Sequence, residues 1–178
     1  MLTKDNTGLL VIDIQGKLSE LIHESGALFA QVKTLIKGAN LMGLPIVCLE
    51  QLPNKLGRTR EEIAELLPQP AFEKSTFSGW RTEAIAQKIK DTGCEHWLVV
   101  GIEAHVCVYQ TVADLLANGF MVEVVTDAVG SRVLANKDLA ISKMESLGSR
   151  LTSVEMALFE LQEIAEGDEF RQLIKIVK

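Results

Sequence analysis

The segment Gly8-Leu9-Leu10-Val11-Ile12-Asp13 is a short run of apolar residues that ends in a carboxylate. Runs of this length are typical of strands that are buried on both faces of a parallel sheet. A second run of the same kind, Trp97-Leu98-Val99-Val100-Gly101, predicts the strongest strand of the chain. The long separation between the two runs leaves room for the crossover helices that parallel strands require.

Between the predicted strands, apolar residues recur in steps of three and four, which is the spacing of an amphipathic helix. Over 18–42 this pattern predicts one helix, closed by Gly43 and Pro45. Further strands are predicted at 45–49, 71–74, 121–126 and 151–152, and further helices at 60–67, 82–90, 105–117, 136–147, 154–164 and 170–177. The alternation predicts a doubly wound α/β fold, a six-stranded parallel sheet with helices on both faces, in a single domain over residues 1–178.

Composition and charge exclude several classes of protein. The chain has a net charge of −6, with 47% hydrophobic and 24% charged residues, the usual mix of a globular protein. No stripe of lysine and arginine marks a nucleic-acid binder. The apolar runs are far shorter than the roughly 20 residues that cross a bilayer, and residues 1–5 lack the pattern of a secretory signal. We expect a cytoplasmic protein that binds neither nucleic acid nor membrane.

The three cysteines, Cys48, Cys94 and Cys107, form no CxxC pair, and their number is odd. Both features argue against a disulfide framework or a zinc cage. We therefore expect three free thiols.

Polar residues follow most of the predicted strands, at the ends where doubly wound sheets bind ligands. They are Asp13, Glu50-Gln51, Lys74-Ser75-Thr76, the residues from Glu103 to Cys107, and Asp127. Because the carboxyl ends of parallel strands meet at one edge of a sheet, we expect these residues to ring one cleft.

Asp13, Lys74 and Cys107 are the members of this set that predict chemistry. Cys107 falls in the first turn of a predicted helix, where free backbone N–H groups and the helix dipole favour a thiolate. Asp13 would accept the thiol proton, and Lys74 would stabilise the carboxylate and the thiolate or assist charge development in the substrate. Each residue also has a plainer interpretation, since a buried cysteine is usually core, an aspartate can cap a helix and a lone lysine is usually solvated.

Four segments in this order resemble the isochorismatase-like hydrolases. They are Val11-Ile12-Asp13-Ile14-Gln15, Glu73-Lys74-Ser75-Thr76-Phe77-Ser78, Gly101-Ile102-Glu103-Ala104-His105-Val106-Cys107 and Thr126-Asp127-Ala128. The resemblance implies a parallel six-stranded sheet and a catalytic triad of Asp13, Lys74 and Cys107. It also implies a cis peptide bond at Ile102-Glu103, which would aim the N–H groups of Glu103 and Cys107 at an oxyanion.

The chain also departs from parts of that family. Nicotinamidases carry an Asp-x-His motif and further histidines that bind a metal, whereas this chain has Leu49-Glu50-Gln51 after its second strand and three histidines in all. We therefore expect no metal and no cofactor. Isochorismatases proper generally lack the cysteine, so Cys107 favours acyl-type chemistry. Glu103-Ala104, together with two segments after the second strand, resembles the isochorismatase-domain-containing subgroup, which has no firmly assigned substrate.

These observations predict a metal-independent hydrolase that acts on a small amide, ester or related electrophile, with C–N bonds as in amidases favoured. We expect Glu50, Gln51, Phe77 and Trp80 to contact the small-molecule substrate. The alternatives are an isochorismatase-type or nicotinamidase-type activity, or a catalytically silent binding protein. Family resemblance also implies a homo-oligomer, a dimer or tetramer, with an apolar interface expected from Met156, Leu158, Phe159 and Leu161.

Overall fold

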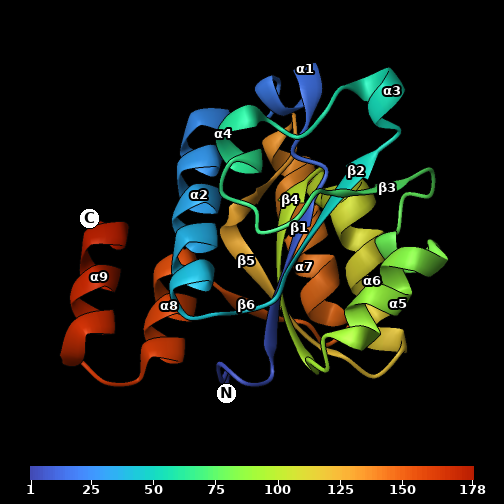
Figure 1. Ribbon diagram of the computed structural model, residues 1–178. Helices are drawn as coiled ribbons and strands as arrows, with labels where there is room; N and C mark the ends of the chain where they lie inside the picture. The colour runs from blue at the N-terminus through green and yellow to red at the C-terminus, as the bar shows by residue number, and fades with distance from the viewer.

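The computed structural model describes residues 1–178 and contains one sheet of six parallel strands in the order β3-β2-β1-β4-β5-β6 (Figure 1). The strands are β1 (Thr7–Ile12), β2 (Ile46–Gln51), β3 (Phe72–Lys74), β4 (His96–Ile102), β5 (Met121–Gly130) and β6 (Arg150–Thr152). All neighbouring strands pair in parallel. The predicted six-stranded parallel α/β fold is therefore confirmed.

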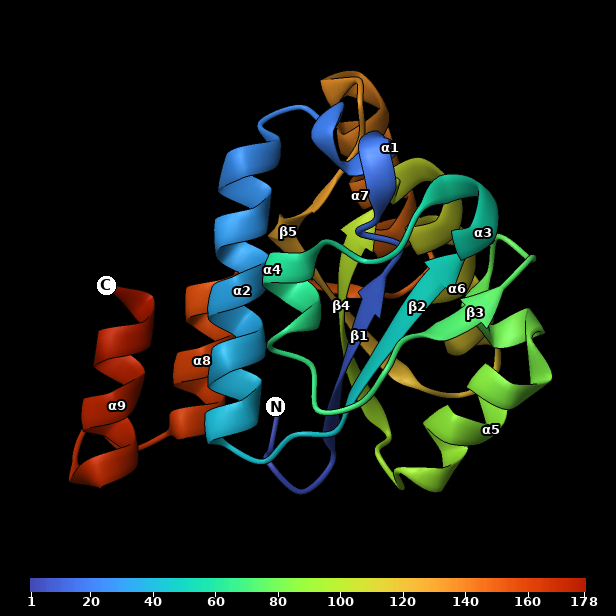
Figure 2. The same ribbon diagram turned by 45° about the horizontal axis from the view of Figure 1, so that its top comes forward.

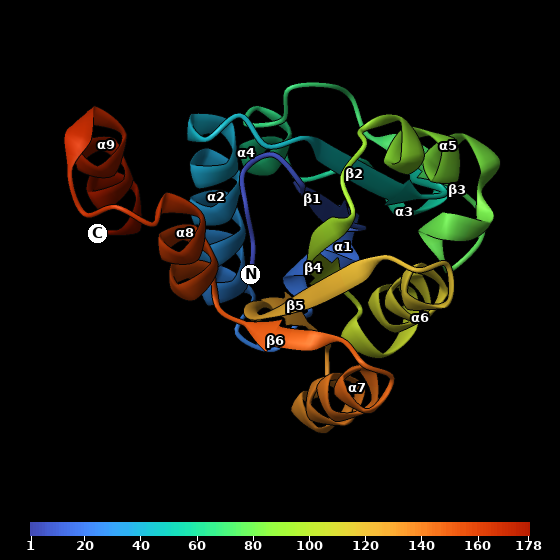
Figure 3. The same cartoon turned by 90° about the horizontal axis from the view of Figure 1, so that it is seen from below.

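Helices cover both faces of the sheet, as Figure 3 shows from below. One face carries α2 (Ser25–Leu41), α4 (Glu61–Ala64) and α8 (Val154–Gln162), with α9 (Gly167–Val177) outside α2 and α8. The other face carries α5 (Glu83–Asp91), α6 (Tyr109–Ala117) and α7 (Leu134–Ser146). The short helices α1 (Gly16–Glu20) and α3 (Pro53–Leu56) lie at the top edge in Figure 1.

The strands are apolar throughout because both faces are buried. Side chains of successive strand residues point to opposite faces. In β1, Leu9 and Val11 pack into the core under α2 and α8, while Leu10 and Ile12 pack into the core under α5, α6 and α7. Every residue of β1 and of β4 is buried, so neither strand shows the polar alternation of a half-exposed sheet.

The predicted helix over 18–42 is wrong in one respect, because the chain forms two helices there, α1 and α2. Between them Glu24 adopts a left-handed backbone with φ of 54°. The N–H of His23 donates to the carbonyl of Ser131 at 3.1 Å, so this turn is tied to a distant loop instead of continuing the helix. Apolar residues keep helical spacing on both sides of the break, and their periodicity therefore conceals it.

Strand β5 also extends beyond the predicted end at 126. Its pairing with β4 shifts register between Val99 and Gly101, and beyond the shift Val129 and Gly130 pair with Gly101 and Ile102. The polar pair Thr126-Asp127 reads as the end of a strand, but it occupies an irregular stretch in the middle of one. A register shift of this kind lets a strand continue past residues that break its pattern.

The apolar set predicted for a subunit interface divides between core and surface. Leu158 and Leu161 are buried in the core against the sheet, so they cannot form an outer interface as expected. Phe159 packs its ring edge-to-face on Phe170 of α9, with the ring centroids 6.5 Å apart. Met156 alone is largely exposed. The homo-oligomer stays a prediction.

The carboxyl ends of β1 and β4 approach each other closely at the top of the sheet (Figure 2). Gly101 has φ of 129°, and a Cβ atom built on it would lie 2.1 Å from the backbone oxygen of Ile12. Only glycine allows this contact, which brings Asp13 and the segment after β4 together. None of the helices combines the length and the apolar character needed to cross a bilayer.

We predict that Gly101→Ala lowers the free energy of unfolding by about 2 kcal/mol or more. The new methyl group would clash with the backbone of Ile12, and alanine would have to adopt a φ that it disfavours. Gly26→Ala is the matched control, since it lies in α2 and its added Cβ would meet nothing within 4 Å beyond the backbone of its own helix. It should be neutral or stabilise by up to about 1 kcal/mol. Urea denaturation of both variants measures the difference, and equal stabilities would contradict the argument.

Candidate active site

A cavity of about 130 Å³ opens at the carboxyl ends of the central strands. Its lining residues come from the carboxyl ends of β1, β2 and β4 and the segments that directly follow β1 and β4, from the loop after β3, and from the small helices α1 and α3. They are Asp13, Gln15, Leu18, Gln51, Leu56, Phe77, Ile102, Glu103, Val106 and Cys107. The expectation that strand ends meet at one cleft therefore holds for β1, β2 and β4.

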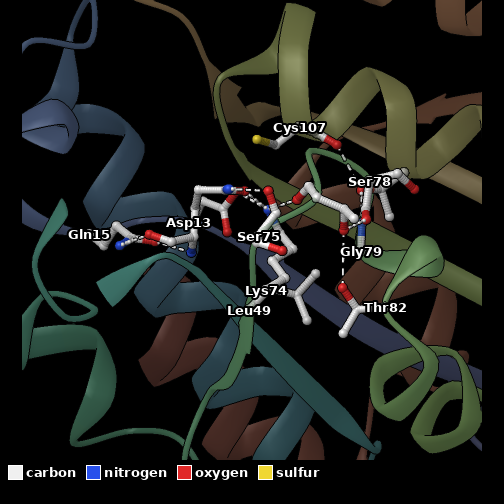
Figure 4. Close-up of polar contacts among 12 residues, drawn as sticks. Asp13, Gln15, Leu49, Lys74, Ser75, Ser78, Gly79, Thr82 and Cys107 are labelled. Atoms are coloured by element: carbon white, nitrogen blue, oxygen red, sulfur yellow. Dashed lines mark hydrogen bonds and ion pairs between the residues drawn. The ribbon is translucent and has the colours of Figure 1, made fainter. Parts of the chain in front are cut away.

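Asp13 and Lys74 form a buried ion pair beside this cavity (Figure 4). Lys74 is the last residue of β3 and reaches across β2, its Nζ lying 2.6 Å from Asp13 Oδ2. The ammonium also donates to Gln51 Oε1 at 2.7 Å and to the carbonyl of Thr76 at 3.3 Å. These three acceptors use all three N–H donors of the lysine, so its charge is buried with every donor satisfied.

Two glutamine side chains hold the strand ends in register around this ion pair. Gln15 Oε1 accepts the backbone N–H of Gln51 at 2.6 Å, and its Nε2 donates to the carbonyls of Gln51 and Gly57. Gln51 Nε2 donates to the carbonyl of Ser75 at 2.9 Å, while its Oε1 accepts from Lys74. No cluster of three or more His, Cys, Asp or Glu side chains in the molecule is arranged to hold a metal ion.

Cys107 lies in a π-helical turn, Ala104–Val108, that precedes α6. Its carbonyl accepts from the Thr111 hydroxyl at 2.7 Å, and the same hydroxyl accepts the N–H of Gly79 at 3.0 Å. Thr111 therefore ties the turn to the loop after β3. Figure 4 shows Cys107 on a different element from Asp13 and Lys74, across the site from them.

The electrostatics of Cys107 differ from the predicted thiolate. Burial and then the charge of Asp13 raise the pKa of the Cys107 thiol to about 12, and Lys74 offsets only part of this effect. Burial also raises the pKa of Asp13, against the opposing charge of Lys74. The helix start is visible in the sequence, but the depth of the thiol and the nearness of a carboxylate are not. The resting cysteine is therefore a neutral thiol.

Asp13 has one oxygen free beside this thiol. Oδ2 accepts from Lys74, whereas Oδ1 is buried and has no hydrogen-bond partner. Asp13 itself has a left-handed backbone with φ of 53°. A buried carboxylate oxygen without a donor is costly unless something fills that role. Oδ1 therefore lies in the wall of the cavity as an acceptor that no donor occupies.

Glu103 follows a cis peptide bond at Ile102-Glu103, as the family resemblance implies. Its Oε1 accepts from the backbone N–H and the Nε of Arg132 at 3.2 and 2.9 Å, and its Oε2 accepts from Nη2 at 3.3 Å. Burial alone would raise the pKa of Glu103, but the hydrogen bonds from Arg132 outweigh it and lower the pKa. The cavity wall therefore carries an ionised carboxylate whose cation lies outside the lining.

Eight residues predicted for the cleft or the substrate do not line the cavity: Glu50, Lys74, Ser75, Thr76, Trp80, Ala104, His105 and Asp127. Three of them, Glu50, Trp80 and Asp127, have partners elsewhere. Glu50 turns away from the cavity, and its Oε1 accepts the N–H and hydroxyl of Thr59 at 2.6 and 2.7 Å. Trp80 packs on Phe120, with ring centroids 5.3 Å apart, and does not line the cavity. Asp127 Oδ1 accepts the N–H of Val154 at 3.0 Å, at the first residue of α8.

Of the four residues predicted to contact substrate, Gln51 and Phe77 do line the cavity. Sequence reasoning missed Gln15, Leu18 and Leu56 among the lining residues, whereas Val106 belongs to the segment from Glu103 to Cys107 that was expected there. The sequence could have indicated Gln15, since it comes two residues after Asp13 in the same segment. Leu18 was assigned to one long helix over 18–42 instead of to the separate α1, and no periodic pattern marks the four-residue helix α3 that carries Leu56.

The chain is similar to known proteins over most of its length. A family model described as Isochorismatase domain matches residues 7–156. The secreted isochorismatase effector Isc1 of Phytophthora sojae is 33% identical over 96% of this chain and 83% of its own length. Isochorismatase domain-containing protein 1 of Salmo salar is 32% identical over 93% of this chain, which spans only 59% of the salmon protein.

Two solved structures show the same fold at comparable identity. The MAR1 ribonuclease of Caenorhabditis elegans superposes with a TM-score of 0.92 at 32% identity, over 99% of this chain and 91% of that one. YcaC of Pseudomonas aeruginosa, with hexane-2,5-diol and covalent acrylamide, has a TM-score of 0.92 at 25% identity, over 98% of this chain and 90% of that one.

We predict that Lys74→Met lowers the free energy of unfolding by about 3–5 kcal/mol near pH 8, because it leaves the Asp13 carboxylate buried without a cation. Without Lys74, the pKa of Asp13 rises further, so the folded state binds a proton more readily than the unfolded state does. The deficit should therefore shrink as pH falls from about 8 to about 5.

The double variant Asp13→Asn/Lys74→Met is the control for this experiment. It removes the buried charge, so it should regain stability near pH 8 and lose the pH dependence. Urea denaturation at several pH values measures all three proteins. If the loss of stability in Lys74→Met does not change with pH, the unpaired charge of Asp13 is not its cause.

Proposed function

The chain belongs to the isochorismatase family, and on that premise we propose that it is a hydrolase with Cys107 as nucleophile and Asp13 as general base. Lys74 fixes the position of the Asp13 carboxylate and stabilises its ionised form. The observation that carries the proposal is the buried Asp13–Lys74 pair at 2.6 Å, whose free Oδ1 lies beside a cavity that Cys107 also lines. A nucleophile and a base oriented by a third group make the arrangement that covalent hydrolysis requires.

The first step transfers a proton as the sulfur attacks. The pKa of Cys107 is about 12, so little thiolate exists at neutral pH. The thiol proton passes to Asp13 Oδ1 while the sulfur forms a bond to the substrate carbonyl carbon. The raised pKa of Asp13 favours this transfer, because it makes the carboxylate a stronger base than a solvated aspartate.

The second step expels the leaving group and is followed by hydrolysis. The carbonyl oxygen becomes an oxyanion, for which the N–H groups of Glu103 and Cys107 are the proposed donors. As the C–N or C–O bond breaks, Asp13 returns the proton to the leaving amine or alcohol, and a thioester remains on Cys107. Water then attacks the thioester, Asp13 takes its proton and gives it to sulfur, and the acid product leaves the free thiol.

Short amides are the substrates that we favour, with esters next. Support comes from YcaC of Pseudomonas aeruginosa, whose structure contains covalent acrylamide, a small uncharged amide. Nicotinamidase-type activity is disfavoured by the donors at the site, because Gln51 binds Lys74 and offers no metal ligand. Isochorismatase-type activity and a silent binding protein remain the alternatives.

One relative raises a different activity, since the Caenorhabditis elegans protein is named a ribonuclease. We infer that this chain does not act on RNA. Its net charge is −6, and the cavity wall carries Glu103, which would repel a phosphate backbone. The cavity of about 130 Å³ is also small for a nucleotide. A cytoplasmic location stays a prediction, and the Phytophthora relative is called secreted.

We predict that Cys107→Ala abolishes hydrolysis of any amide or ester found in a panel of short substrates, whereas Cys94→Ser preserves it. Cys94 is the matched control because it is also buried but lies outside the cavity. RNA belongs in the panel as well. Release of acid product measures turnover, and full turnover by Cys107→Ala would remove the nucleophile from the proposal.

For Asp13→Asn we predict a loss of turnover of about 100-fold or more, because the base is gone. Removing that charge also lowers the pKa of Cys107, since Asp13 raises it. Alkylation of Cys107 should then follow a thiolate titration that begins at lower pH than in the wild type. In the wild type, Asp13 accepts the thiol proton, so the rate of Cys107 alkylation should follow the ionisation of Asp13 and fall at the acid pH where Asp13 becomes protonated. Mass spectrometry of each cysteine across pH measures both profiles, and identical profiles would contradict the role of Asp13.

A further inference from the structure

We propose that the cavity selects uncharged substrates and excludes carboxylates, and that it takes a short apolar group of about six non-hydrogen atoms beside the reacting bond. The inference rests on the proposed function, because it describes what Cys107 attacks. It narrows the substrate class and says nothing about the order of the chemical steps.

No cation is available to a bound carboxylate. The ten lining residues include two acids and no lysine, arginine or histidine. Lys74 lies behind the wall, and its three N–H groups already donate to Asp13, Gln51 and Thr76. Arg132 is committed to Glu103 through its backbone N–H, Nε and Nη2. An anionic substrate would therefore lose its hydration without gaining an ion pair.

The acids in the wall act against an anion directly. Glu103 stays ionised, since its hydrogen bonds from Arg132 hold its pKa low. A second carboxylate beside it in a partly buried site experiences like-charge repulsion that water screens poorly. The cations that pair with these two acids, Lys74 and Arg132, both lie outside the lining, so the wall presents acids and no cation.

The polar side chains of the wall have little hydrogen-bonding capacity left for a polar substrate tail. Gln15 uses its oxygen on the N–H of Gln51 and its nitrogen on two carbonyls. Gln51 accepts from Lys74 with its oxygen and donates one of its two side-chain N–H groups to the carbonyl of Ser75. The remaining free acceptor is Asp13 Oδ1, which the mechanism assigns to the thiol proton. Apart from Asp13 Oδ1, one N–H of Gln51 is the side-chain group left over, so the substrate needs few polar groups besides the one that reacts.

Apolar side chains make up the rest of the wall and set its size. They are Leu18, Leu56, Phe77, Ile102 and Val106. The volume of about 130 Å³ is slightly less than that of an apolar cavity of about 150 Å³, which holds benzene. A short alkyl chain or a small ring fits this space. A dicarboxylate such as isochorismate does not fit these charges, which disfavours the isochorismatase-type alternative.

Alkylation of Cys107 by two reagents of nearly equal size tests the charge selection. Iodoacetamide is neutral and iodoacetate is anionic, and each forms a C–S bond, expels iodide and leaves the thiol proton to Asp13. Rates at Cys107 are divided by those of the same cysteine in the urea-unfolded chain. We expect the normalised preference for iodoacetamide to be about tenfold or more.

Glu103→Gln should reduce this preference at least about threefold, because it removes the repelling charge and frees Arg132. Glu73→Gln is the matched control, since Glu73 is also paired with an arginine, Arg58, but lies outside the cavity and is half exposed. It should leave the preference unchanged. Equal normalised rates for the two reagents in the wild type would overturn the charge selection, while fast labelling of Cys107 would leave the nucleophile standing.

Binding to Cys107→Ser tests the inference without relying on reactivity. Propanamide should shift NMR signals of residues that line the cavity, whereas propanoate should not, and the bulky adamantane-1-carboxamide should not bind either. Equal binding of propanamide and propanoate would overturn the charge selection, and binding of the adamantyl amide would overturn the size limit. If Cys107 reacts with neither alkylating reagent, the proposed nucleophile fails, and this binding experiment still decides the charge selection.

Discussion

The ion pair between Asp13 and Lys74 is the constraint on which the site depends. Two charges removed from water cost more than their attraction returns unless every donor is used. Lys74 meets this condition by reaching over β2, where Gln51 and Thr76 supply its other acceptors. Three strands are thereby fixed at their carboxyl ends, and the base is aimed at the cavity. A displacement of β3 would break the ion pair and would also leave the Asp13 carboxylate without a fixed position.

Around this pair, neutral and charged groups have separate tasks. Gln15 and Gln51 position backbone without adding charge, so the lysine has a single carboxylate partner in the cavity wall. Glu50 lies behind the wall and fixes the segment around Thr59 through three hydrogen bonds, two from Thr59 and one from Arg58. A carboxylate in place of the amide of Gln51 would compete with Asp13 for Lys74. The choice of amide at that position therefore preserves the base.

Much of this could be predicted from the sequence, and the failures share a cause. Buried strands such as Leu9–Ile12 are signalled by composition alone, and polar residues after them locate the site. The break before α2 depends on His23 bonding to Ser131, a contact between distant residues that local periodicity cannot reveal. The same is true of Asp127, whose partner is the first turn of α8. Burial of Cys107 is likewise a property of the packed chain, and it reverses the direction expected for its pKa.

That reversal changes how reactivity should be understood in this fold. A thiolate held ready in an apolar cavity would need a permanent cation beside it, and that cation would also bind anionic ligands. Here the thiol stays neutral, and Lys74 is bound to Asp13 behind the wall, so the cavity meets no cation in the resting state. Charge develops only as the proton moves from Cys107 to Asp13 and an electrophile accepts the sulfur. Suppressing the resting thiolate and excluding anions are thus two consequences of the same closed ion pair.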